Sequence, residues 1–383
     1  MIPFDYQPRT RIVFGPGKIE VLGELALELG ARRALVVSDR GVVAAGHTAK
    51  GIDSLRAAGV ETRLFDDVHE NPSTADVAGG LVVARELQPD LLVGLGGGSA
   101  MDCAKGINFI YTNGGELKDY WGVGKATQAM LPMIAVPTTA GTGSETQSFA
   151  LISDSETHVK MACGDKKASC RVALLDPELT VTQPSRVTAL TGIDAISHAL
   201  ETFVTKKRNL VSLAFSREAW RMLAGNLGRV LKHPTDLEAR SAMQLGACLA
   251  GLAIENSMLG ATHALANPLT AVYGIPHGQA IGVLLPHVVR FNGEAVGGWY
   301  RDLLGSSTED NGLPPAEEGS EGLARFLTHL AAQAGLVTRL RDLEVENVRL
   351  GELAADAAKQ WTATFNPRPA HEAELLAVYR QAF

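Results

Sequence analysis

One carboxylate and three imidazoles lie at positions from which they could bind a metal ion together. Asp194 and His198 are four residues apart in a helical pattern, which places their Cβ atoms on one face, about 6 Å from each other. His263 lies in a second, mostly apolar helical run, and His277 follows a glycine-isoleucine-proline turn. One aspartate and three histidines form an oxygen and nitrogen ligand set that Fe²⁺ or Zn²⁺ accepts.

Each of these residues also has a purely structural interpretation. A single histidine on an alanine-rich helix is more often a hydrogen-bonded residue than a ligand, Asp194 could cap a helix locally, and His277 could belong to a turn. The three structural interpretations together are less satisfactory. Asp194, His198 and His263 all lie in stretches too apolar to bury unpaired polar groups at low cost.

A glycine-rich loop at residues 96–99 could bind a phosphate. It follows the apolar run Leu91–Leu95 and leads into a helix expected to begin near Met101. Backbone N–H groups can approach a phosphate closely where glycine has no side chain, and a helix N-terminus adds about half a positive charge. Ser99 stands where a GxGxxG motif has its last glycine, so a tight turn without a ligand remains an alternative.

A second loop of small residues, 137–145, follows another apolar run and offers hydroxyls and accessible amides. Ligands bind at the carboxyl ends of strands in open α/β sheets, so two such loops predict a nucleotide site. Asp39 ends an earlier apolar run and could accept hydrogen bonds from a ribose diol, which would favour NAD over NADP. The alternative for Asp39 is a helix cap, which is the more frequent use of such an aspartate.

The first half of the chain must supply the elements that position these loops. Several of its apolar runs are nearly continuous, as in strands buried on both faces of a parallel sheet. The apolar runs are Arg11–Phe14, Ala34–Ser38, Glu61–Phe65, Leu91–Leu95, Met133–Pro137 and Val172–Leu175. Between them lie stretches with helical spacing, namely Gly17–Leu29, Val42–Ala58, Thr74–Leu87 and Met101–Ile110.

From about residue 185 the pattern becomes helical throughout. The expected helices cover Ser185–Thr202, Val211–Arg229, Leu237–Ala253, Ala261–Tyr273, Glu321–Ala334, Asn347–Gln360 and Glu372–Arg380. Alanine and leucine, which dominate them, are strong helix formers. The sequence therefore predicts an α/β domain with a doubly wound parallel sheet over residues 1–184, followed by an all-α domain over residues 185–383.

Composition excludes several other classes of protein. The 383 residues carry a formal charge of −7, from 35 basic and 42 acidic side chains, so we expect no nucleic-acid partner. No apolar run reaches the roughly 18 residues of a membrane span, and the N-terminus shows no apolar signal core, so we expect a cytoplasmic protein without a membrane partner. The four cysteines lie apart without CxxC spacing, which argues against thiolate zinc and a disulfide framework.

Taken in order along the chain, these motifs resemble those of the iron-containing, or group III, alcohol dehydrogenases. The resemblance covers nearly the whole length. It rests on GGGS at 96–99 with Asp102 and Lys105, PTTAGTGSE at 137–145, GIDAISHALE at 192–201 and HALANP at 263–268, then PHG at 276–278, LLPHV at 284–288 and NPRP at 366–369.

The resemblance implies the dehydroquinate synthase-like architecture of that family, Fe²⁺ with Zn²⁺ as an alternative, NAD(H), and a homodimer to which an N-terminal edge strand contributes. It implies Asp194, His198, His263 and His277 as metal ligands, and Asn267 and His277 as catalytic positions. The implied nucleotide-binding positions are Asp39, Asn71, Gly97, Gly98, Ser99, Asp102, Thr138, Thr139, Thr142, Phe149, Lys160 and Leu179.

One position departs from the family pattern. Many members that reduce short aldehydes have a histidine, often given a role in proton transfer, where this chain has Asn267. An amide can donate and accept hydrogen bonds but cannot titrate, so Asn267 can only orient a substrate or a water molecule. Any proton relay must then use water, the ribose hydroxyls or another group.

We therefore expect a metal-dependent, NAD(H)-linked alcohol dehydrogenase or aldehyde reductase. It would transfer a hydride between nicotinamide and a metal-bound small primary alcohol or diol, with lactaldehyde and propanediol as examples. Oxidoreductases resembling maleylacetate reductase or glycerol dehydrogenase are alternatives from the same superfamily. A metal-dependent hydrolase would be an alternative from another class, but it would leave both glycine loops unexplained.

Overall fold

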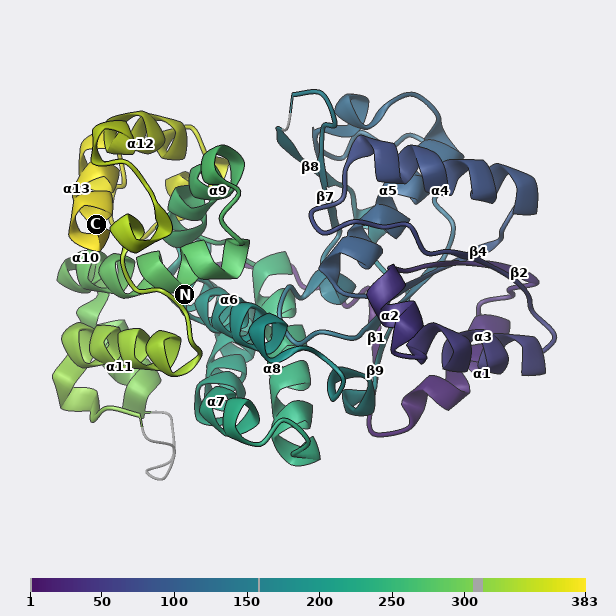
Figure 1. Cartoon of the computed structure of the whole chain (residues 1–383), viewed down its shortest axis with the longest axis horizontal. Coiled ribbons are helices and arrows are strands. Elements are labelled where there is room, and N and C mark those ends of the chain that lie inside the picture. Colours follow the sequence, from purple (N-terminus) through teal and green to yellow (C-terminus); the bar gives the residue numbers. More distant parts are fainter. Residues whose placement is uncertain (1, 158, 306–312) are drawn as a thin grey trace. The chain divides into compact units, whose positions relative to one another are not determined.

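The computed structural model describes residues 2–157, 159–305 and 313–383, which form two compact units (Figure 1). One unit, here called the α/β unit, contains Gln7–Thr139 and Gly143–Gln183. The other, the helical unit, contains the described residues of Met1–Tyr6, Ala140–Thr142 and Pro184–Phe383. The predicted combination of a parallel-sheet α/β part and a helical C-terminal part is confirmed.

The α/β unit is built on a six-stranded sheet in the order β1-β9-β6-β4-β2-β3, in which every neighbouring pair is parallel. All six predicted strands are present within one residue at either end. They are β1 (Arg11–Phe14), β2 (Arg33–Val37), β3 (Glu61–Phe65), β4 (Leu91–Gly96), β6 (Met133–Pro137) and β9 (Val172–Leu175).

Helices cover both faces of this sheet, and the side chains of β2 alternate between the two cores. Ala34 and Val36 pack in the core that includes α1 and α3, whereas Leu35 and Val37 pack in the core that includes α4 and α5. Burial on both faces explains why the central strands β2, β4, β6 and β9 are nearly continuously apolar, whereas the edge strands β1 and β3 are more exposed. The helices are α1 (Leu22–Glu28), α2 (Arg40–Ala44), α3 (His47–Ala57), α4 (Thr74–Leu87) and α5 (Gly98–Asn113).

A smaller sheet, which the sequence patterns did not predict, adds β5, β8 and β7 in that order. Its strands β7 and β8 form an antiparallel pair, and β7 packs against α5. The bounds are β5 (Gly122–Val123), β7 (Phe149–Ser153) and β8 (Lys160–Gly164). The short 3₁₀ helices of the α/β unit are η1 (Lys18–Val21), η2 (Leu117–Tyr120), η3 (Ser144–Thr146), η4 (Lys166–Ala168) and η5 (Pro177–Thr180).

The helical unit surrounds one continuous apolar core. Its helices are α6 (Ser185–Val204), α7 (Leu210–Lys232), α8 (Leu237–Glu255), α9 (Ala261–Tyr273), α10 (His277–Gly305), α11 (Gly319–Gln333), α12 (Leu350–Ala358) and α13 (Glu372–Ala382). Its 3₁₀ helices are η6 (Ala316–Glu318), η7 (Leu340–Leu343), η8 (Asn347–Arg349) and η9 (Trp361–Phe365). The sequence patterns did not predict α10, which is interrupted by a non-helical residue at Val296.

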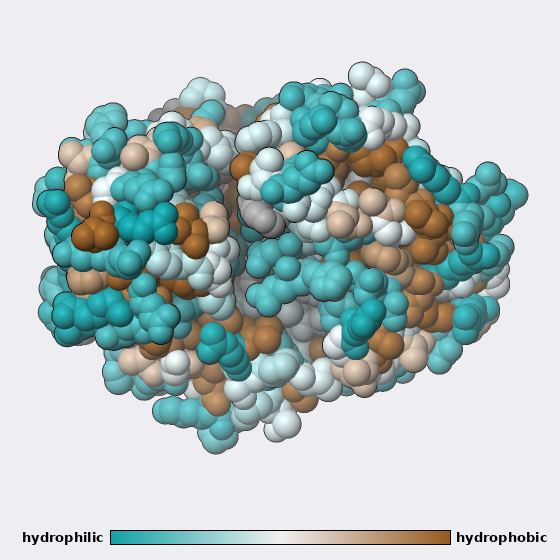
Figure 2. All heavy atoms as spheres, turned by 45° about the horizontal axis from the view of Figure 1, so that its top comes forward, coloured by the Kyte–Doolittle hydropathy of each residue, from teal (hydrophilic) through white to brown (hydrophobic). Residues whose placement is uncertain are grey.

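The surface shown in Figure 2 is mainly hydrophilic, with apolar residues interspersed among polar ones. Across the described residues, no helix combines the length and the apolar character that crossing a membrane requires.

Candidate metal centre and nucleotide loops

Four side chains of the helical unit point their ligand atoms at one small volume. Helix α6 supplies Asp194 and His198, α9 supplies His263, and α10 begins with His277. The Oδ1 atom of Asp194 lies 3.4 Å from Nε2 of His198, 3.5 Å from Nε2 of His263 and 3.7 Å from Nε2 of His277. The Nε2 atoms of His198 and His263 are 3.1 Å apart. The four residues that sequence analysis grouped are thus neighbours.

Ligand atoms of Asp194, His263 and His277 all lie within 4.8 Å of one another and fit one metal ion, and His198 adjoins this trio through Asp194 and His263. Ligand atoms about 2.1 Å from a tetrahedral ion lie about 3.4 Å from one another, close to the separations seen here. Asp194 Oδ1 is buried and, within the part of the chain that the structure describes, forms no hydrogen bond. A buried carboxylate oxygen without a donor is costly, and a cation would remove that cost.

Glycine at position 278 allows α10 to begin at this place. A Cβ atom there would lie 2.3 Å from the carbonyl oxygen of Leu190, on α6, which is an impossible contact. The preceding residue, His277, thereby reaches Asp194 while keeping its side chain 25% exposed, whereas the other three ligand side chains are almost fully buried. Solvent and small molecules therefore reach the centre from the side of His277, and the side of the other three ligands is buried.

The charges around the centre favour a cation. Burial alone would raise the pKa of Asp194, but the neighbouring imidazoles, first His198, hold that pKa below its usual range. Burial lowers the pKa of His198. Burial would also lower the pKa of His263, but the carboxylates of Asp194 and Glu201 outweigh it and raise this pKa to about 9. The two carboxylates thus stabilise one positive charge between them.

Glu201 is a residue of this centre to which sequence analysis assigned no role. Its Oε2 atom lies 2.6 Å from Nδ1 of His263, on the side of the imidazole ring opposite Asp194. A signal was present in the sequence, because Asp194, His198 and Glu201 follow the helical spacing i, i+4, i+7 on α6.

Asn267 lies one helical turn after His263 on α9 and is half-buried. Its Nδ2 atom donates a hydrogen bond to Oε1 of Gln360, at 3.0 Å. Two amides therefore meet beside the helix face that carries His263. Both can form hydrogen bonds, and neither can exchange a proton near neutral pH.

In the α/β unit, Gly97, Gly98 and Ser99 lie at the start of α5, directly after β4. Gly97 is the N-cap residue, and no side chain caps the helix at this position. The first N–H groups of a helix are unpaired and can donate to an anion. The expected strand-to-helix loop is therefore present, and its role in binding a phosphate stays a prediction.

The second loop begins beside the first, because the backbone N–H of Thr138 donates to the carbonyl of Gly96 at 2.9 Å. The methyl group of Thr139 lies against Gly97, since a Cβ added there would be 3.4 Å from it. Thr138, Thr139 and the glycine loop share the carboxyl edge of β4 and β6. Thr142 is not part of this group, because Ala140–Thr142 pack with the helical unit.

Asp39 follows β2 and caps α2, with Oδ1 accepting from the N–H of Val42 at 3.0 Å. Its other oxygen faces the glycine loop, since a Cβ added to Gly96 would lie 3.3 Å from Oδ2. Asp39 therefore occupies both of the roles considered from the sequence. It is a helix cap, and it lies beside the loop at the carboxyl edge of the sheet.

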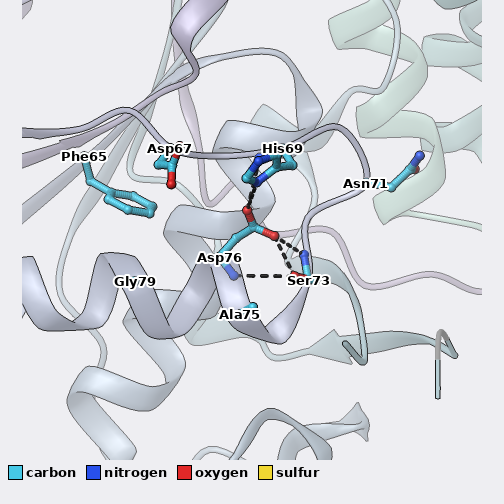
Figure 3. A pocket seen from close by; sticks show the side chains of 8 residues that line it. All are labelled: Phe65, Asp67, His69, Asn71, Ser73, Ala75, Asp76 and Gly79. Carbon is cyan, nitrogen blue, oxygen red and sulfur yellow. Dashed lines mark hydrogen bonds and ion pairs between the residues drawn. The ribbon is translucent and has the colours of Figure 1, made fainter. Parts of the chain in front are cut away.

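Asn71 adopts a left-handed conformation, with a φ angle of 54°, in the segment after β3. It contributes to the lining of a cavity of about 480 Å³, together with Phe65, Asp67, His69, Ser73, Ala75, Asp76 and Gly79. Figure 3 shows His69 directed at Asp76, with Asn71 set apart from this pair. The cavity contains one predicted nucleotide-binding residue, Asn71.

The remaining predicted nucleotide-binding residues, Asp102, Phe149, Lys160 and Leu179, lie on α5, β7, β8 and η5 of the α/β unit. Asp102 lies one turn into α5, where its Oδ1 accepts from the hydroxyl of Ser144 at 2.6 Å. Phe149 begins β7 and Lys160 begins β8, and Leu179 is buried in η5. For these residues no contact singles out a ligand, so a role in nucleotide binding stays a prediction.

Comparison with known proteins identifies the family. The family model "Iron-containing alcohol dehydrogenase" matches residues 8–177, and the model "Fe-containing alcohol dehydrogenase family, C-terminal" matches residues 188–383. The chain belongs to the iron-containing alcohol dehydrogenases. This membership confirms the predicted class of enzyme, an NAD-linked oxidoreductase of alcohols and aldehydes.

Individual members of the iron-containing alcohol dehydrogenases are similar over their full length. A 1,3-propanediol dehydrogenase of Klebsiella pneumoniae is 38% identical over 383 residues, with 99% of each chain covered. A crystal structure of a 1,3-propanediol oxidoreductase superposes with a TM-score of 0.95 at 37% identity and 100% coverage of both chains. A sulfoacetaldehyde reductase of Bifidobacterium kashiwanohense, solved with NAD⁺, gives 0.90 at 28% identity, with 100% of this chain and 99% of that one covered.

Proposed function

We propose that this enzyme interconverts a small primary alcohol or diol and its aldehyde, with 1,3-propanediol as the first substrate to test. The activity depends on a divalent metal, Fe²⁺ first and Zn²⁺ second, bound by Asp194, His198, His263 and His277. The observation that carries the proposal is the cluster of their ligand atoms around the buried, hydrogen-bond-free Oδ1 of Asp194. The similar 1,3-propanediol dehydrogenase supports the choice of substrate.

In this proposal, residues 1–184 bind NAD(H) and residues 185–383 hold the metal. The N–H groups of the first turn of α5 donate hydrogen bonds to the pyrophosphate. The carboxylate of Asp39 accepts hydrogen bonds from the ribose hydroxyls and would repel a 2′-phosphate. The other nucleotide contacts are proposed at Asn71, Asp102, Thr138, Thr139, Thr142, Phe149, Lys160 and Leu179. When bound, the metal supplies Lewis-acid polarisation of the substrate oxygen, and the nicotinamide exchanges the hydride.

Asn267 and His277 are the side chains that we propose to act beside the substrate. His277 is the most exposed of the four ligands, so the substrate approaches from its side. The amide pair of Asn267 and Gln360 offers hydrogen bonds to a substrate hydroxyl and holds it in one orientation. Because neither amide titrates, the proton of the alcohol leaves through water or a ribose hydroxyl.

The sequence also led us to expect a homodimer and a cytoplasmic location. Strand β1 lies at the edge of the large sheet, with the exposed Phe14 at its end, and such an edge can pair with a second chain. Light scattering would test the dimer, and cell fractionation would test the location.

Metal dependence is the decisive test of the proposed function. The protein would be stripped with a chelator and reconstituted anaerobically with Fe²⁺ or Zn²⁺. NADH formation would then be followed with 1,3-propanediol, 1-propanol and glycerol. We expect turnover only with metal, and its loss in His198→Ala but not in His233→Ala, a control at an exposed histidine. Equal turnover of the stripped and the reconstituted protein would refute the proposal.

A further inference from the structure

Glu201 is buried on the same face of α6 as the two ligands Asp194 and His198, with 4% of its surface exposed. Its carboxylate is directed away from Asp194 and towards the far side of His263. Oε2 lies 2.6 Å from Nδ1 of that imidazole. The His263 ring is therefore held between two carboxylates, with Nδ1 facing Glu201 and Nε2 facing Asp194.

The second oxygen of Glu201 fixes the start of α9. Oε1 accepts the backbone N–H of Thr262 at 2.6 Å, within the first turn of the helix that carries His263. Gly260 leaves room for this arrangement, since a Cβ atom there would lie 3.1 Å from Oε1 and 3.0 Å from Oδ1 of Asn366. One carboxylate thus sets both the position of the helix and the orientation of the ring.

We propose that Glu201 is a positioning residue of the metal centre, which holds His263 as the tautomer with hydrogen on Nδ1 and a free electron pair on Nε2. This inference rests on the proposed metal site. A carboxylate behind a ligand histidine fixes the ring and increases the basicity of the coordinating nitrogen. Only the tautomer with an unprotonated Nε2 can coordinate an ion on the side of Asp194.

Charge distinguishes this role from that of a helix cap alone. A neutral serine or asparagine caps a helix as well as a carboxylate does, and burying it costs less. The negative charge of Glu201 is explained by the ion, because Asp194 and Glu201 together balance the two positive charges of Fe²⁺ or Zn²⁺. The carboxylate therefore serves the metal centre in addition to α9.

The test compares Glu201→Gln with the wild-type protein and with Glu145→Gln, which replaces a similarly buried glutamate of the α/β unit. In Glu201→Gln, the carbonyl oxygen can still accept from Thr262, but the amide N–H₂ then faces Nδ1 of His263. The ring must turn its electron pair to that N–H₂, which places hydrogen on Nε2. Zn²⁺ affinity would be measured by competition with a fluorescent chelator, and urea unfolding would be measured on the metal-free proteins.

We expect Glu201→Gln to bind Zn²⁺ roughly 10–100-fold more weakly than wild type. We expect Glu145→Gln to bind like wild type. Metal-free Glu201→Gln should unfold at a lower urea midpoint than wild type, because a buried charge pair with His263 is lost, so Zn²⁺ affinity is compared in urea-free buffer, where the variant is folded. Binding by Glu201→Gln within a factor of about three of wild type would overturn the proposal. Failure of the wild-type protein itself to bind Zn²⁺ or Fe²⁺ would instead refute the proposed function.

A second measurement applies even where the variant does not fold. The ¹⁵N shifts of the histidine rings in the metal-free wild-type protein report which nitrogen carries hydrogen, and His263→Asn identifies the relevant signals. At a pH well above 9, where the ring is neutral, hydrogen on Nδ1 and none on Nε2 of His263 supports the proposal. An Nε2-protonated, neutral His263 at a pH well above 9 overturns it.

Discussion

The ammonium group of Lys105, on α5, donates a hydrogen bond to the carbonyl oxygen of Ser144 at 2.7 Å. The same nitrogen donates to the carbonyl oxygens of Gln147 and Phe149, at 2.8 and 2.9 Å, and the lysine is almost completely buried. The carboxylate of Asp102 lies 3.8 Å away. The charge of this buried ammonium group is thus balanced by backbone carbonyl dipoles. Its hydrogen bonds connect α5, the helix that follows the glycine loop, to the end of the 137–145 loop and to the start of β7.

Replacement of Lys105 by methionine should therefore destabilise the protein. The variant keeps the aliphatic chain but removes the Lys105 donor from one buried and two half-buried residues, which should lower the free energy of unfolding by roughly 3 kcal/mol or more. Lys118→Met, at an exposed lysine, serves as the control. Urea unfolding would measure the change, and a loss below about 0.5 kcal/mol would show that Lys105 does not fasten the loop.

Alanine substitutions at two neighbouring glycines of the glycine loop should have different effects, one on stability and the other on nucleotide binding. A Cβ at Gly96 would lie 2.8 Å from that of Ala100, and the φ angle of 157° is unfavourable for other residues, so Gly96→Ala should cost roughly 1–3 kcal/mol of stability. Gly97 has an ordinary φ angle of −75° and more room. Gly97→Ala should unfold like wild type and yet bind NADH more weakly, as measured by fluorescence titration. Unchanged NADH affinity would exclude close contact between Gly97 and the nucleotide.

The large sheet could be predicted from the sequence because burial on both faces makes its central strands nearly continuously apolar. The antiparallel pair β7 and β8 could not, although its strands are as long as those of the large sheet, because burial alternates along β7 and β8 begins with an exposed lysine. Helix α10 was missed for another reason. It contains Pro286 and several glycines, which normally interrupt helices, and it forms because its buried apolar face packs into the core of the helical unit.

In the candidate site, too, the residues that follow local sequence patterns could be predicted, and the contacts between distant segments could not. Asp194 and His198 could be paired from helical spacing alone. His263 and His277 were grouped with them from their positions in an apolar helical run and a turn, and the resemblance to the family implied the same set. Helical spacing placed Glu201 on the same face of α6 as Asp194 and His198, but it could not show the contact with His263, which joins residues 62 positions apart. The Asn267–Gln360 pair, 93 positions apart, was equally invisible in the sequence.

Introduction of an imidazole at Asn267 should change the pH dependence of catalysis. Residue 267 cannot titrate in the wild-type enzyme, whereas an ordinary histidine has a pKa of about 6.5. In Asn267→His, neutral imidazole can accept the proton of the alcohol, so kcat for alcohol oxidation should gain a limb that rises with pH through about 6–7. The pH profiles of kcat for both proteins would test this. Identical profiles would indicate that residue 267 takes no part in proton transfer.

Glu145 should make the stability of the protein depend on pH near neutrality. Burial raises the pKa of this carboxyl from its ordinary 4.5 to about 7. The folded state favours the neutral carboxyl. The contribution of Glu145 to the free energy of unfolding is therefore fully present below pH 4.5 and is lost as the pH rises through 7. Relative to Glu145→Gln, which stays neutral, wild type should lose roughly 2–3 kcal/mol of unfolding free energy between about pH 5 and 8. Urea unfolding of both proteins across this range measures the difference, and a difference independent of pH would mean that the buried carboxyl is already ionised at pH 5.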